Sequence, residues 1–425
     1  MLSKRLFGLA TAALFTATAT TAFAAPILFW SDQGTPVEEQ QAIRDTVLKG
    51  FDGEVDFQPQ DPAPFVTRIQ AEAQAGKGLI GVIGGLHGDF AGFPDAVADV
   101  TDLAASLGSV GVNQTYLGLG KLSTGEQKYI PWMQATYIMA ANKKALEYLP
   151  AGADINALTY DQLIAWAKNL AEKTGSPKFG LPAGPKGLIH RFVQGYLYPS
   201  FTSSEVTKFR SPEAVAMWEK VKELWKYTSP ASTNYGFMQE QLLSGEVWVA
   251  WDHTARLADA FNQKPDDFVA FPAPAGPAGR GFMPVVAGLG IPKTAPDMDG
   301  AKKLIAYMMQ PATQIATLKA IGFFPVVKAD LPADMPNSVK AEGAAVAAQS
   351  GSADANPGLL PIGLGSAGGK FNKVYTDTFQ QILLNNADIK GVLDQQAGIL
   401  AGIMKDANAP CWAPDKPSTG ACPVD

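Results

Sequence analysis

The chain has 425 residues, with 34 Lys and Arg against 40 Asp and Glu, and a formal net charge of −6. This acidic balance, without any run of Lys or Arg, argues against a nucleic-acid partner and against binding to an anionic membrane surface. Single hydrophobic cores stop growing near ~250 to 300 residues, so we expect two lobes, each with its own core.

The N-terminal segment is typical of a secretory signal peptide. A basic pair at positions 4 and 5 precedes an apolar stretch over 6–19, and A-F-A at 22–24 forms a cleavage site. Cleavage after Ala24 would leave 401 residues and remove the basic pair, so the formal charge becomes −8. No later segment reads as a transmembrane helix, and no Cys follows the cleavage site to take a lipid. We expect a soluble exported protein, most simply in a bacterial periplasm.

Strands and helices alternate at the start of the chain. Apolar runs at 25–30 and 79–86 and an alternating run at 54–60 predict strands, and helical spacing at 37–51 and 64–76 separates them. Alternating β and α units imply a mostly parallel sheet wrapped by helices. Because such a sheet binds ligands at the carboxyl ends of its strands, the loops at 31–35, at 84–89 and after Trp132 are the candidate binding loops.

Two amphipathic helices are predicted in the middle of the chain. One begins at Thr159 as its N-cap and ends at Gly175. The other begins at Ser211, with Pro212 in its first position, and places Trp218 on its apolar stripe. A β run at 247–251, a strand with a glycine break at 283–292, and helices within 371–384 and 389–405 complete the prediction.

The only two cysteines, Cys411 and Cys422, lie in a Pro- and Gly-rich C-terminal tail. In an oxidising compartment we expect them to form a disulfide that pins the tail and contributes roughly 3 kcal/mol by loop entropy. The alternative is a redox pair, which usually has C-x-x-C spacing.

Five phrases resemble the family-1 extracellular solute-binding proteins of ATP-driven importers, the group that contains the maltose-binding protein. They follow one another between Lys128 and Val327 and read YIPWMQATYIMAANKKAL, ALTYDQLIAWAKNLAEKTG, LLSGEVWVAWDHTARL, VVAGLGIPKTAPDMDGAKKLIAYMM and IGFFPVV. The resemblance implies an α/β, two-lobed periplasmic binding protein fold, with each lobe a mostly parallel sheet flanked by helices and three crossovers joining the lobes. It also implies a protein that closes on a carbohydrate and delivers it to the transmembrane permease subunits of an ABC importer.

Lobe boundaries follow from the resemblance. We expect 1–24 to be the signal peptide, 25–133 and 285–328 to form lobe 1, and 134–284 and 329–425 to form lobe 2. The lobes should flex about three strands, near Met133, Val286 and Val327. We expect a monomer without a cofactor.

The candidate ligand contacts lie at strand ends and crossings, where a sugar site needs aromatic faces and side chains that donate and accept hydrogen bonds. They are Asp32, Gln33, His87, Trp132, Gln134, His190, Trp251, Asp252, His253, Arg256 and Gly288. Of these, Trp132 and Gln134 would border the first crossing, and Gly288 would bring backbone amides to the cleft near the second.

Structural alternatives exist for several of these residues. Asp32 and Asp252 can each cap the helix that follows, and Trp132 can pack in the hinge. His87 can be a satisfied surface histidine, and His190 with Arg191 can be an exposed basic pair.

Enzymatic motifs are missing from the sequence. It contains no G-x-S-x-G, no H-E-x-x-H, no Walker-type phosphate loop and no dinucleotide fingerprint in a strand-to-helix context. The three histidines include no closely spaced pair for a metal. Because Arg binds oxyanions bidentately, an anionic sugar derivative or a glycerophosphoryl compound is the alternative ligand. A polyamine or peptide would need clustered carboxylates around the cleft.

Overall fold

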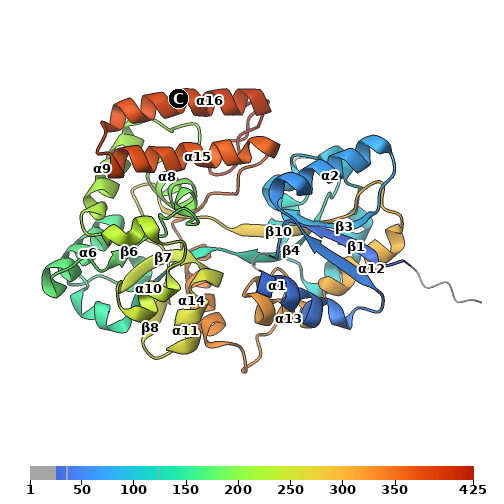
Figure 1. Cartoon of the computed structure of the whole chain (residues 1–425), viewed down its shortest axis with the longest axis horizontal. Coiled ribbons are helices and arrows are strands. Elements are labelled where there is room, and N and C mark those ends of the chain that lie inside the picture. The colour runs from blue at the N-terminus through green and yellow to red at the C-terminus, as the bar shows by residue number, and fades with distance from the viewer. Residues whose placement is uncertain (1–24, 35–36, 123) are drawn as a thin grey trace, which may run out of the picture.

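The structure, a computed structural model, describes residues 25–34, 37–122 and 124–425. Two lobes lie side by side, and extended strands run from one to the other (Figure 1). The segment 1–24, predicted to be a signal peptide, lies outside the described residues. Among the residues that are described, no helix is long and apolar enough to cross a bilayer.

Lobe 1 is built on a six-stranded sheet in the order β11-β4-β10-β3-β1-β2. Its strands are β1 (Ile27–Ser31), β2 (Val55–Pro59), β3 (Ile80–Leu86), β4 (Ile130–Ala135), β10 (Val285–Gly290) and β11 (Phe324–Pro325). β1 pairs in parallel with β2 and β3, as expected. β10 returns from the other lobe and therefore runs antiparallel to both β3 and β4. The sheet is mixed rather than mostly parallel.

Lobe 2 contains a four-stranded sheet in the order β6-β7-β5-β8. Its strands are β5 (Tyr137–Asn142), β6 (Phe179–Gly180), β7 (Val249–His253) and β8 (Phe268–Phe271). Only β6 and β7 pair in parallel, so this sheet too departs from the expected parallel arrangement. A two-stranded ribbon of β9 (Arg280–Phe282) and β12 (Ala355–Pro357) lies beside it.

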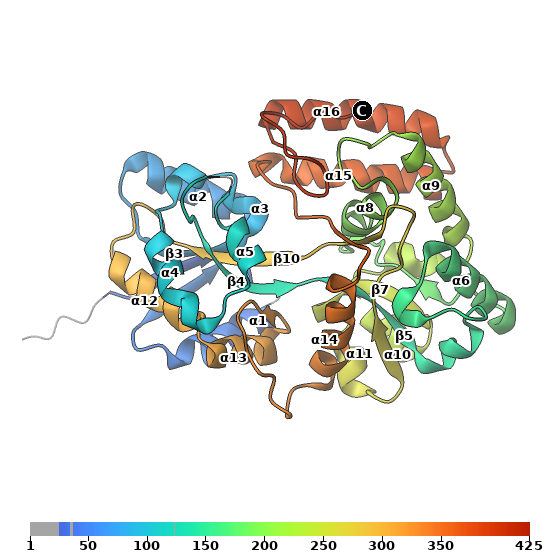
Figure 2. The ribbon, with the colours of Figure 1, turned by 180° about the vertical axis from the view of Figure 1, so that it is seen from behind.

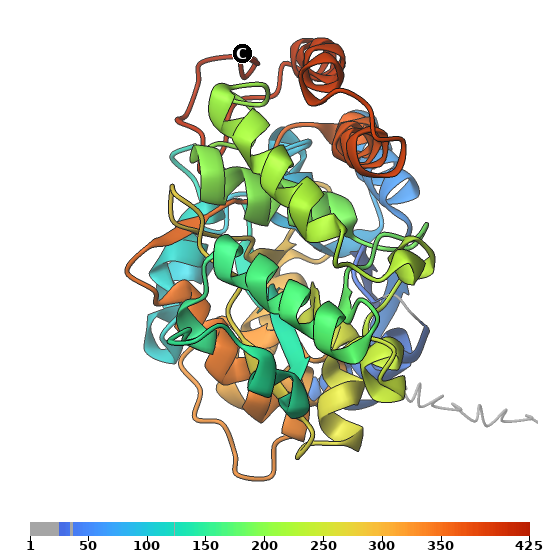
Figure 3. The same cartoon turned by 90° about the vertical axis from the view of Figure 1, so that its left-hand side faces the viewer.

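Helices cover the sheets of both lobes. Those of lobe 1 are α1 (Val37–Ala42), α2 (Pro62–Ala75), α3 (His87–Phe90), α4 (Thr101–Ser106), α5 (Gln114–Leu119), α12 (Met298–Met308) and α13 (Pro311–Ile321). Those of lobe 2 are α6 (Tyr160–Thr174), α7 (Ile189–Phe192), α8 (Tyr198–Thr202), α9 (Pro212–Trp225), α10 (Gln239–Ser244), α11 (Ala258–Gln263), α14 (Asn337–Ser350), α15 (Gly368–Phe379) and α16 (Ile389–Ala407). α14 packs on β5 and β8 (Figure 2). α15 and α16 pack against each other, and α16 also contacts α9 (Figure 3).

Three segments join the lobes. β4 belongs to the first sheet and β5 to the second, with Thr136 alone between them. β9 leads through Met283 and Pro284 into β10, and β11 leads through 326–336 into α14. The two-lobed fold with three crossovers is therefore confirmed.

Apolar side chains of the crossovers connect the cores of the two lobes. The largest cluster of buried side chains includes Phe29 in lobe 1 and Trp251 in lobe 2, and it continues through Met133 and Met283. On the other face of the lobe 1 sheet, Trp30 belongs to a smaller cluster. The expectation of two separate cores is not met, because the crossing strands are themselves apolar.

The predicted helix ends are confirmed. Thr159 and Gln162 form a capping box, and Gly175 ends the helix in the left-handed conformation. The Ser211 side chain accepts a hydrogen bond from the N–H of Ala214. These signals are local, so they were readable from the sequence.

The C-terminal tail is held at two points. Cys411 and Cys422 form the predicted disulfide. The carboxylate of Asp415 accepts hydrogen bonds from three successive backbone N–H groups, those of Glu205, Val206 and Thr207, at 2.7 to 3.0 Å. The tail is thereby fixed to the segment between α8 and α9.

Candidate functional site

The loops after β1 and β3 meet at one edge of the lobe 1 sheet, because the two strands pair in parallel with Ser31 opposite Gly84. The N–H of Asp32 donates to the carbonyl of Gly84 at 3.0 Å. The side chains of Asp32 and Asp89 are hydrogen bonded to each other, and Gln33 Nε2 donates to Asp32 Oδ1 at 2.7 Å. Two carboxyl groups and an amide therefore lie together at this edge.

Both carboxyl groups have raised pKa values, mainly because they are buried. Burial raises the pKa of Asp32 well above its usual range, and the charge of Asp89 raises it further. Burial also raises the pKa of Asp89, while the hydrogen bond with Asp32 and the charge of Arg191 lower it. Two carboxylates in contact do not both ionise easily, so the pair retains a proton. It can both donate and accept hydrogen bonds.

His87 begins α3, directly after β3. Its Nδ1 lies 2.8 Å from the hydroxyl of Tyr129, and its ring is 5% exposed. Burial lowers the pKa of His87 to about 4, so the imidazole is neutral near pH 7. Among the described residues, no group of three His, Cys, Asp or Glu side chains is arranged to hold a metal ion.

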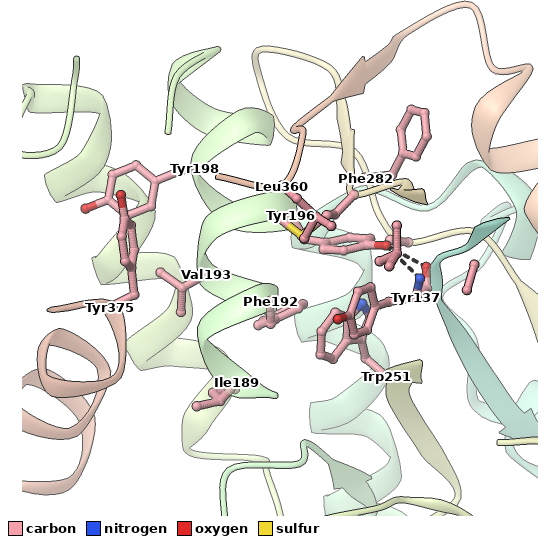
Figure 4. Close-up of a cluster of buried hydrophobic side chains, with 14 of the residues drawn as sticks. Tyr137, Ile189, Phe192, Val193, Tyr196, Tyr198, Trp251, Phe282, Leu360 and Tyr375 are labelled. Atoms are coloured by element: carbon pink, nitrogen blue, oxygen red, sulfur yellow. Dashed lines mark hydrogen bonds between the residues drawn. The ribbon is translucent and has the colours of Figure 1, made fainter. Parts of the chain in front are cut away.

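Lobe 2 contributes a cluster of buried aromatic rings, which we call the aromatic floor (Figure 4); Trp251, Phe192 and Tyr196 are 0% exposed and Tyr137 is 4% exposed. The rings of Tyr137 and Trp251 stack at 4.8 Å with an interplanar angle of 7°. His253 meets Tyr137 edge-on at 5.1 Å, and Phe192 and Tyr196 pack against Trp251 at 4.9 and 5.1 Å. The floor joins β5, β7 and the helix that begins with α7.

Two arginines, Arg191 and Arg256, lie near this floor. Their charges act on the same groups, since both lower the pKa of Tyr137, which burial raises. Both also help burial to lower the pKa of His190. Arg256 Nη1 donates to the carbonyl of Gly236 at 3.1 Å, and its guanidinium lies 4.4 Å from the centre of the Phe237 ring. Arg191 Nη1 donates to Gln194 Oε1 at 3.2 Å.

The two walls face each other in this conformation. The charge of Arg191 in lobe 2 reaches Asp89 in lobe 1. At a second point, the ring of His253 lies 5.7 Å from that of Phe323, between α13 and β11. Lobe 1 thus presents carboxyl groups, and lobe 2 presents guanidinium and neutral imidazole groups.

Four predicted contacts are enclosed within the protein, and one of them, Trp251, is 0% exposed inside the aromatic floor. Trp132 is 0% exposed and packs against Phe29 at 5.7 Å, so it has the hinge-packing role that was its alternative. Gly288 pairs with Gly85 and Pro131 inside the sheet. Its missing side chain makes room for the ring of Tyr129 rather than for a ligand.

Asp252 is also enclosed, at 0% exposed, and it does not cap a helix. Its Oδ2 accepts from the N–H of Met238 at 3.0 Å and its Oδ1 from that of His253 at 2.8 Å. It therefore ties the end of β7 to the start of α10. Burial raises the pKa of Asp252 to about 7, although the charge of Arg256 and the two backbone donors oppose this.

The other predicted contacts lie around the two walls. Gln134, at the end of β4, accepts from the hydroxyl of Tyr116 at 2.7 Å. The residues that the structure brings together in lobe 1 are Asp32, Gln33 and His87, and those in lobe 2 are His190, Trp251, His253 and Arg256.

Sequence reasoning missed Tyr137 and Phe323 as part of this region. Tyr137 lies in an apolar run that reads as core, and Phe323 precedes a short strand at the end of the matching region. The one available signal for Tyr137 was the polar Thr136 before it. Asp89 and Arg191 lie close in sequence to predicted residues, but the influence of the Arg191 charge on Asp89 across the lobes depends on tertiary structure.

Residues 35–315 match the model of a protein family described as bacterial extracellular solute-binding protein. The chain belongs to this family. Its members are the non-catalytic solute-binding components of ABC importers, so this protein binds a small solute outside the cytoplasm and works with a membrane permease. Searched against curated proteins, the sequence matches none.

Solved structures of the same fold cover nearly the whole chain. A maltose-bound MalE3 from T. maritima has a TM-score of 0.68 at 19% identity and covers 88% of this chain and 99% of its own. UgpB from Mycobacterium tuberculosis, in complex with glycerophosphocholine, has a TM-score of 0.67 at 17% identity, with coverages of 90% and 99%. The sugar-binding protein MalE from Xanthomonas citri has a TM-score of 0.68 at 15% identity, with coverages of 89% and 97%. At these identities the likeness concerns the fold.

Proposed function

We propose that this solute-binding protein captures a carbohydrate between its lobes and delivers it to the permease of an ABC importer. The ligand class is a mono- or small oligosaccharide, a polyol or a glycoside. The observation that carries the proposal is that the lobes meet in this conformation, with the ring of His253 in lobe 2 lying 5.7 Å from that of Phe323 in lobe 1 and the charge of Arg191 in lobe 2 acting on Asp89 in lobe 1. A solute bound between them is held from both sides, and only such a solute stabilises the closed form.

Carbohydrate chemistry fits both walls. Hydroxyl groups donate and accept hydrogen bonds, which suits the shared proton of Asp32 and Asp89, the fixed donors of arginine and the neutral imidazoles. The Tyr137–Trp251 stack supplies an apolar face for sugar C–H groups. The structural neighbours that bind maltose and other sugars support the same class.

The proposal assigns roles to the predicted residues. Direct contacts come from Asp32, Gln33, His87, Gln134, His190, His253 and Arg256, and the floor comes from Trp251 under Tyr137. Trp132, Asp252 and Gly288 support the site from the core. The proposed lobe bounds are 25–133 and 285–328 for lobe 1 and 134–284 and 329–425 for lobe 2. Because residues 134 and 135 still pair within the lobe 1 sheet, Thr136 is the crossing point of the first connection.

We also infer a periplasmic location for a monomeric protein, with 1–24 as the export signal. The family description as extracellular supports this. The predicted disulfide, present in the structure, fits an oxidising compartment.

Native mass spectrometry of freshly purified protein, followed by calorimetric titration with maltooligosaccharides, tests the function. We expect a co-purified carbohydrate mass or saturable binding, weakened at least about tenfold by Asp89→Asn, the loss of one charged hydrogen bond. Asp45→Asn, an exposed substitution on the outside of lobe 1, is the matched control and should bind as the parent does. A co-purified peptide or polyamine, with no response to any carbohydrate, would overturn the proposal.

An anionic sugar derivative or glycerophosphoryl compound is the second candidate, favoured by the two arginines beside Tyr137. The neighbour in complex with glycerophosphocholine supports it. Binding of glycerophosphocholine should then weaken severalfold between 50 and 500 mM NaCl and on Arg256→Ala. Arg44→Ala, which removes an exposed lobe 1 arginine, is the charge-matched control. Binding that is independent of salt and of Arg256 favours a neutral sugar.

A further inference from the structure

Thr136 connects two of the three crossovers through its side chain. It stands between β4 and β5, outside both sheets. Its hydroxyl donates to the carbonyl of Met283 at 2.9 Å, and Met283 leads into the second crossover. The first and second connections between the lobes are therefore hydrogen bonded to each other at the point where they cross.

The helix that follows α7 approaches this crossing closely. Gly195 lies in a π-helical turn, Val193–Leu197, of the kind often found at functional sites. A Cβ at Gly195 would lie 2.5 Å from the Cβ of Met283, so only glycine permits this approach. The next residue, Tyr196, is thereby brought to the crossing.

The hydroxyl of Tyr196 binds the chain at the crossing itself. It donates to the carbonyl of Tyr137 at 2.7 Å and accepts from the N–H of Tyr137 at 3.0 Å. It also lies 3.2 Å from the hydroxyl of Thr136. The single hydroxyl of Tyr196 is thus hydrogen bonded to both the N–H and the carbonyl of Tyr137, the first residue of β5. No strand of lobe 1 pairs with Tyr137.

The third connection reaches the same point through Gln349, near the end of α14. Its Nε2 donates to the carbonyl of Tyr137 at 3.1 Å and lies 3.4 Å from the hydroxyl of Thr136. Its Oε1 accepts from the N–H of Ala273 at 2.9 Å. Thr136, Tyr196 and Gln349 form what we call the crossing cluster.

Tyr196 also belongs to the floor of the candidate site. Its ring meets those of Trp251 and Tyr137 edge-on at 5.1 and 6.0 Å. Figure 4 shows this ring between the stacked pair and the crossover, with dashed lines to the backbone of Tyr137. A displacement of the stack and a rotation at the crossing therefore act on one side chain.

We propose that Tyr196 is a positioning residue that couples the Tyr137–Trp251 stack to the angle between the lobes. This inference rests on the proposed function, in which that stack is the floor of the solute site. The hydroxyl of Tyr196 restrains the crossing, and its ring moves together with the Tyr137–Trp251 stack that it contacts. Without the hydroxyl, the N–H of Tyr137 loses its partner and the carbonyl of Tyr137 keeps only Gln349 Nε2, so the lobes sample a wider range of angles.

Interlobe distances measured with spin labels at Lys77→Cys and Lys173→Cys, which are exposed positions in lobes 1 and 2, test the restraint. We expect Tyr196→Phe to broaden the distance distribution about twofold in ligand-free protein. Tyr198→Phe removes an equally buried hydroxyl, which binds the carbonyl of Phe209 at 2.7 Å away from the crossing, and is the matched control. It should lower Tm comparably and leave the distribution unchanged.

Trp251→Phe tests the coupling. It keeps an aromatic ring but alters the stack, so it should broaden the distribution too, and the double variant with Tyr196→Phe should add nothing further. Additive broadening would contradict the coupling. The proposal would be overturned if the interlobe distance distribution of Tyr196→Phe superimposed on that of the parent protein while Tm fell as in Tyr198→Phe. The hydroxyl would then stabilise the fold without restraining the angle between the lobes. No ligand is used, so neither result depends on whether the solute is a carbohydrate.

Discussion

The carboxyl groups of Asp32 and Asp89 share a hydrogen bond at the adjoining ends of β1 and β3. In a folded lobe this arrangement favours a bound proton, because burial and like charge both disfavour two carboxylates. Such a pair costs stability at neutral pH. Its retention beside Arg191 of the other lobe agrees with a role in binding rather than in folding.

We expect Asp32→Asn to raise the free energy of unfolding at pH 8 above that of the parent protein. The native pKa of Asp32 lies above its unfolded value, so the aspartate loses stability as pH rises from about 4 toward the native pKa. The amide is neutral throughout and keeps an acceptor for Gln33. Denaturant unfolding at pH 4 and pH 8 measures this, and the two proteins should be equal at the lower pH. A less stable variant at pH 8 would show that Asp32 is ionised and well paired.

The chain's three histidines should remain neutral across the physiological range. Burial lowers the pKa of His87 to about 4 and that of His253 to about 3, and the pKa of His190 is also lowered. The imidazoles of the unfolded chain bind protons near pH 6.5, whereas those of the native chain do not. The free energy of unfolding should therefore decrease as the pH falls from about 6.5 to about 4. The NMR chemical shifts of the three imidazole rings should not change with pH between pH 5 and 8. Titration of any of the three near 6.5 contradicts its burial.

Asp415→Asn should lower the free energy of unfolding by about 2 to 4 kcal/mol. An amide replaces one acceptor oxygen with an NH2 group, which then faces backbone donors and leaves a buried N–H unsatisfied. Asp406→Asn, exposed on α16, is the control and should change stability by less than about 0.5 kcal/mol. Chemical denaturation measures both. Equal effects would mean that the tail is held by its disulfide alone.

Gly288→Ala should destabilise the protein by about 1 to 3 kcal/mol, because a Cβ would overlap the ring of Tyr129 within the sheet. Gly402→Ala offers the opposite case. Gly402 lies inside α16 with open space around it, and its replacement should stabilise by about 1 kcal/mol. Thermal unfolding of both variants tests this contrast. A neutral Gly288→Ala would show that Tyr129 can move.

The elements most readily predicted were those with local signals. The helices starting after Thr159 and Ser211 carry their own caps, and Asp32 and His87 follow strands whose carboxyl ends must meet in a parallel pair. The place where the chain leaves one sheet for the other was not predictable in this way. Thr136 marks it through contacts with Met283 and Gln349, 147 and 213 residues away.

The same distinction between local signals and long-range contacts applies to the site residues. A buried aromatic such as Trp132 or Tyr137 has the same sequence pattern in a core and in a binding floor. Only the packing shows that Trp132 faces Phe29, whereas Tyr137 lies among arginines of lobe 2. Likewise, the sequence cannot reveal that the charge of Arg191 acts on Asp89, since the two residues belong to different lobes.

Small-angle X-ray scattering, with and without a saturating carbohydrate that calorimetry has shown to bind, decides whether solute is held between the lobes. We expect the radius of gyration to fall on binding, and the fall to disappear in Asp89→Asn at equal sugar concentration. Saturable binding with an unchanged radius of gyration would place the solute elsewhere on the protein and contradict closure around it.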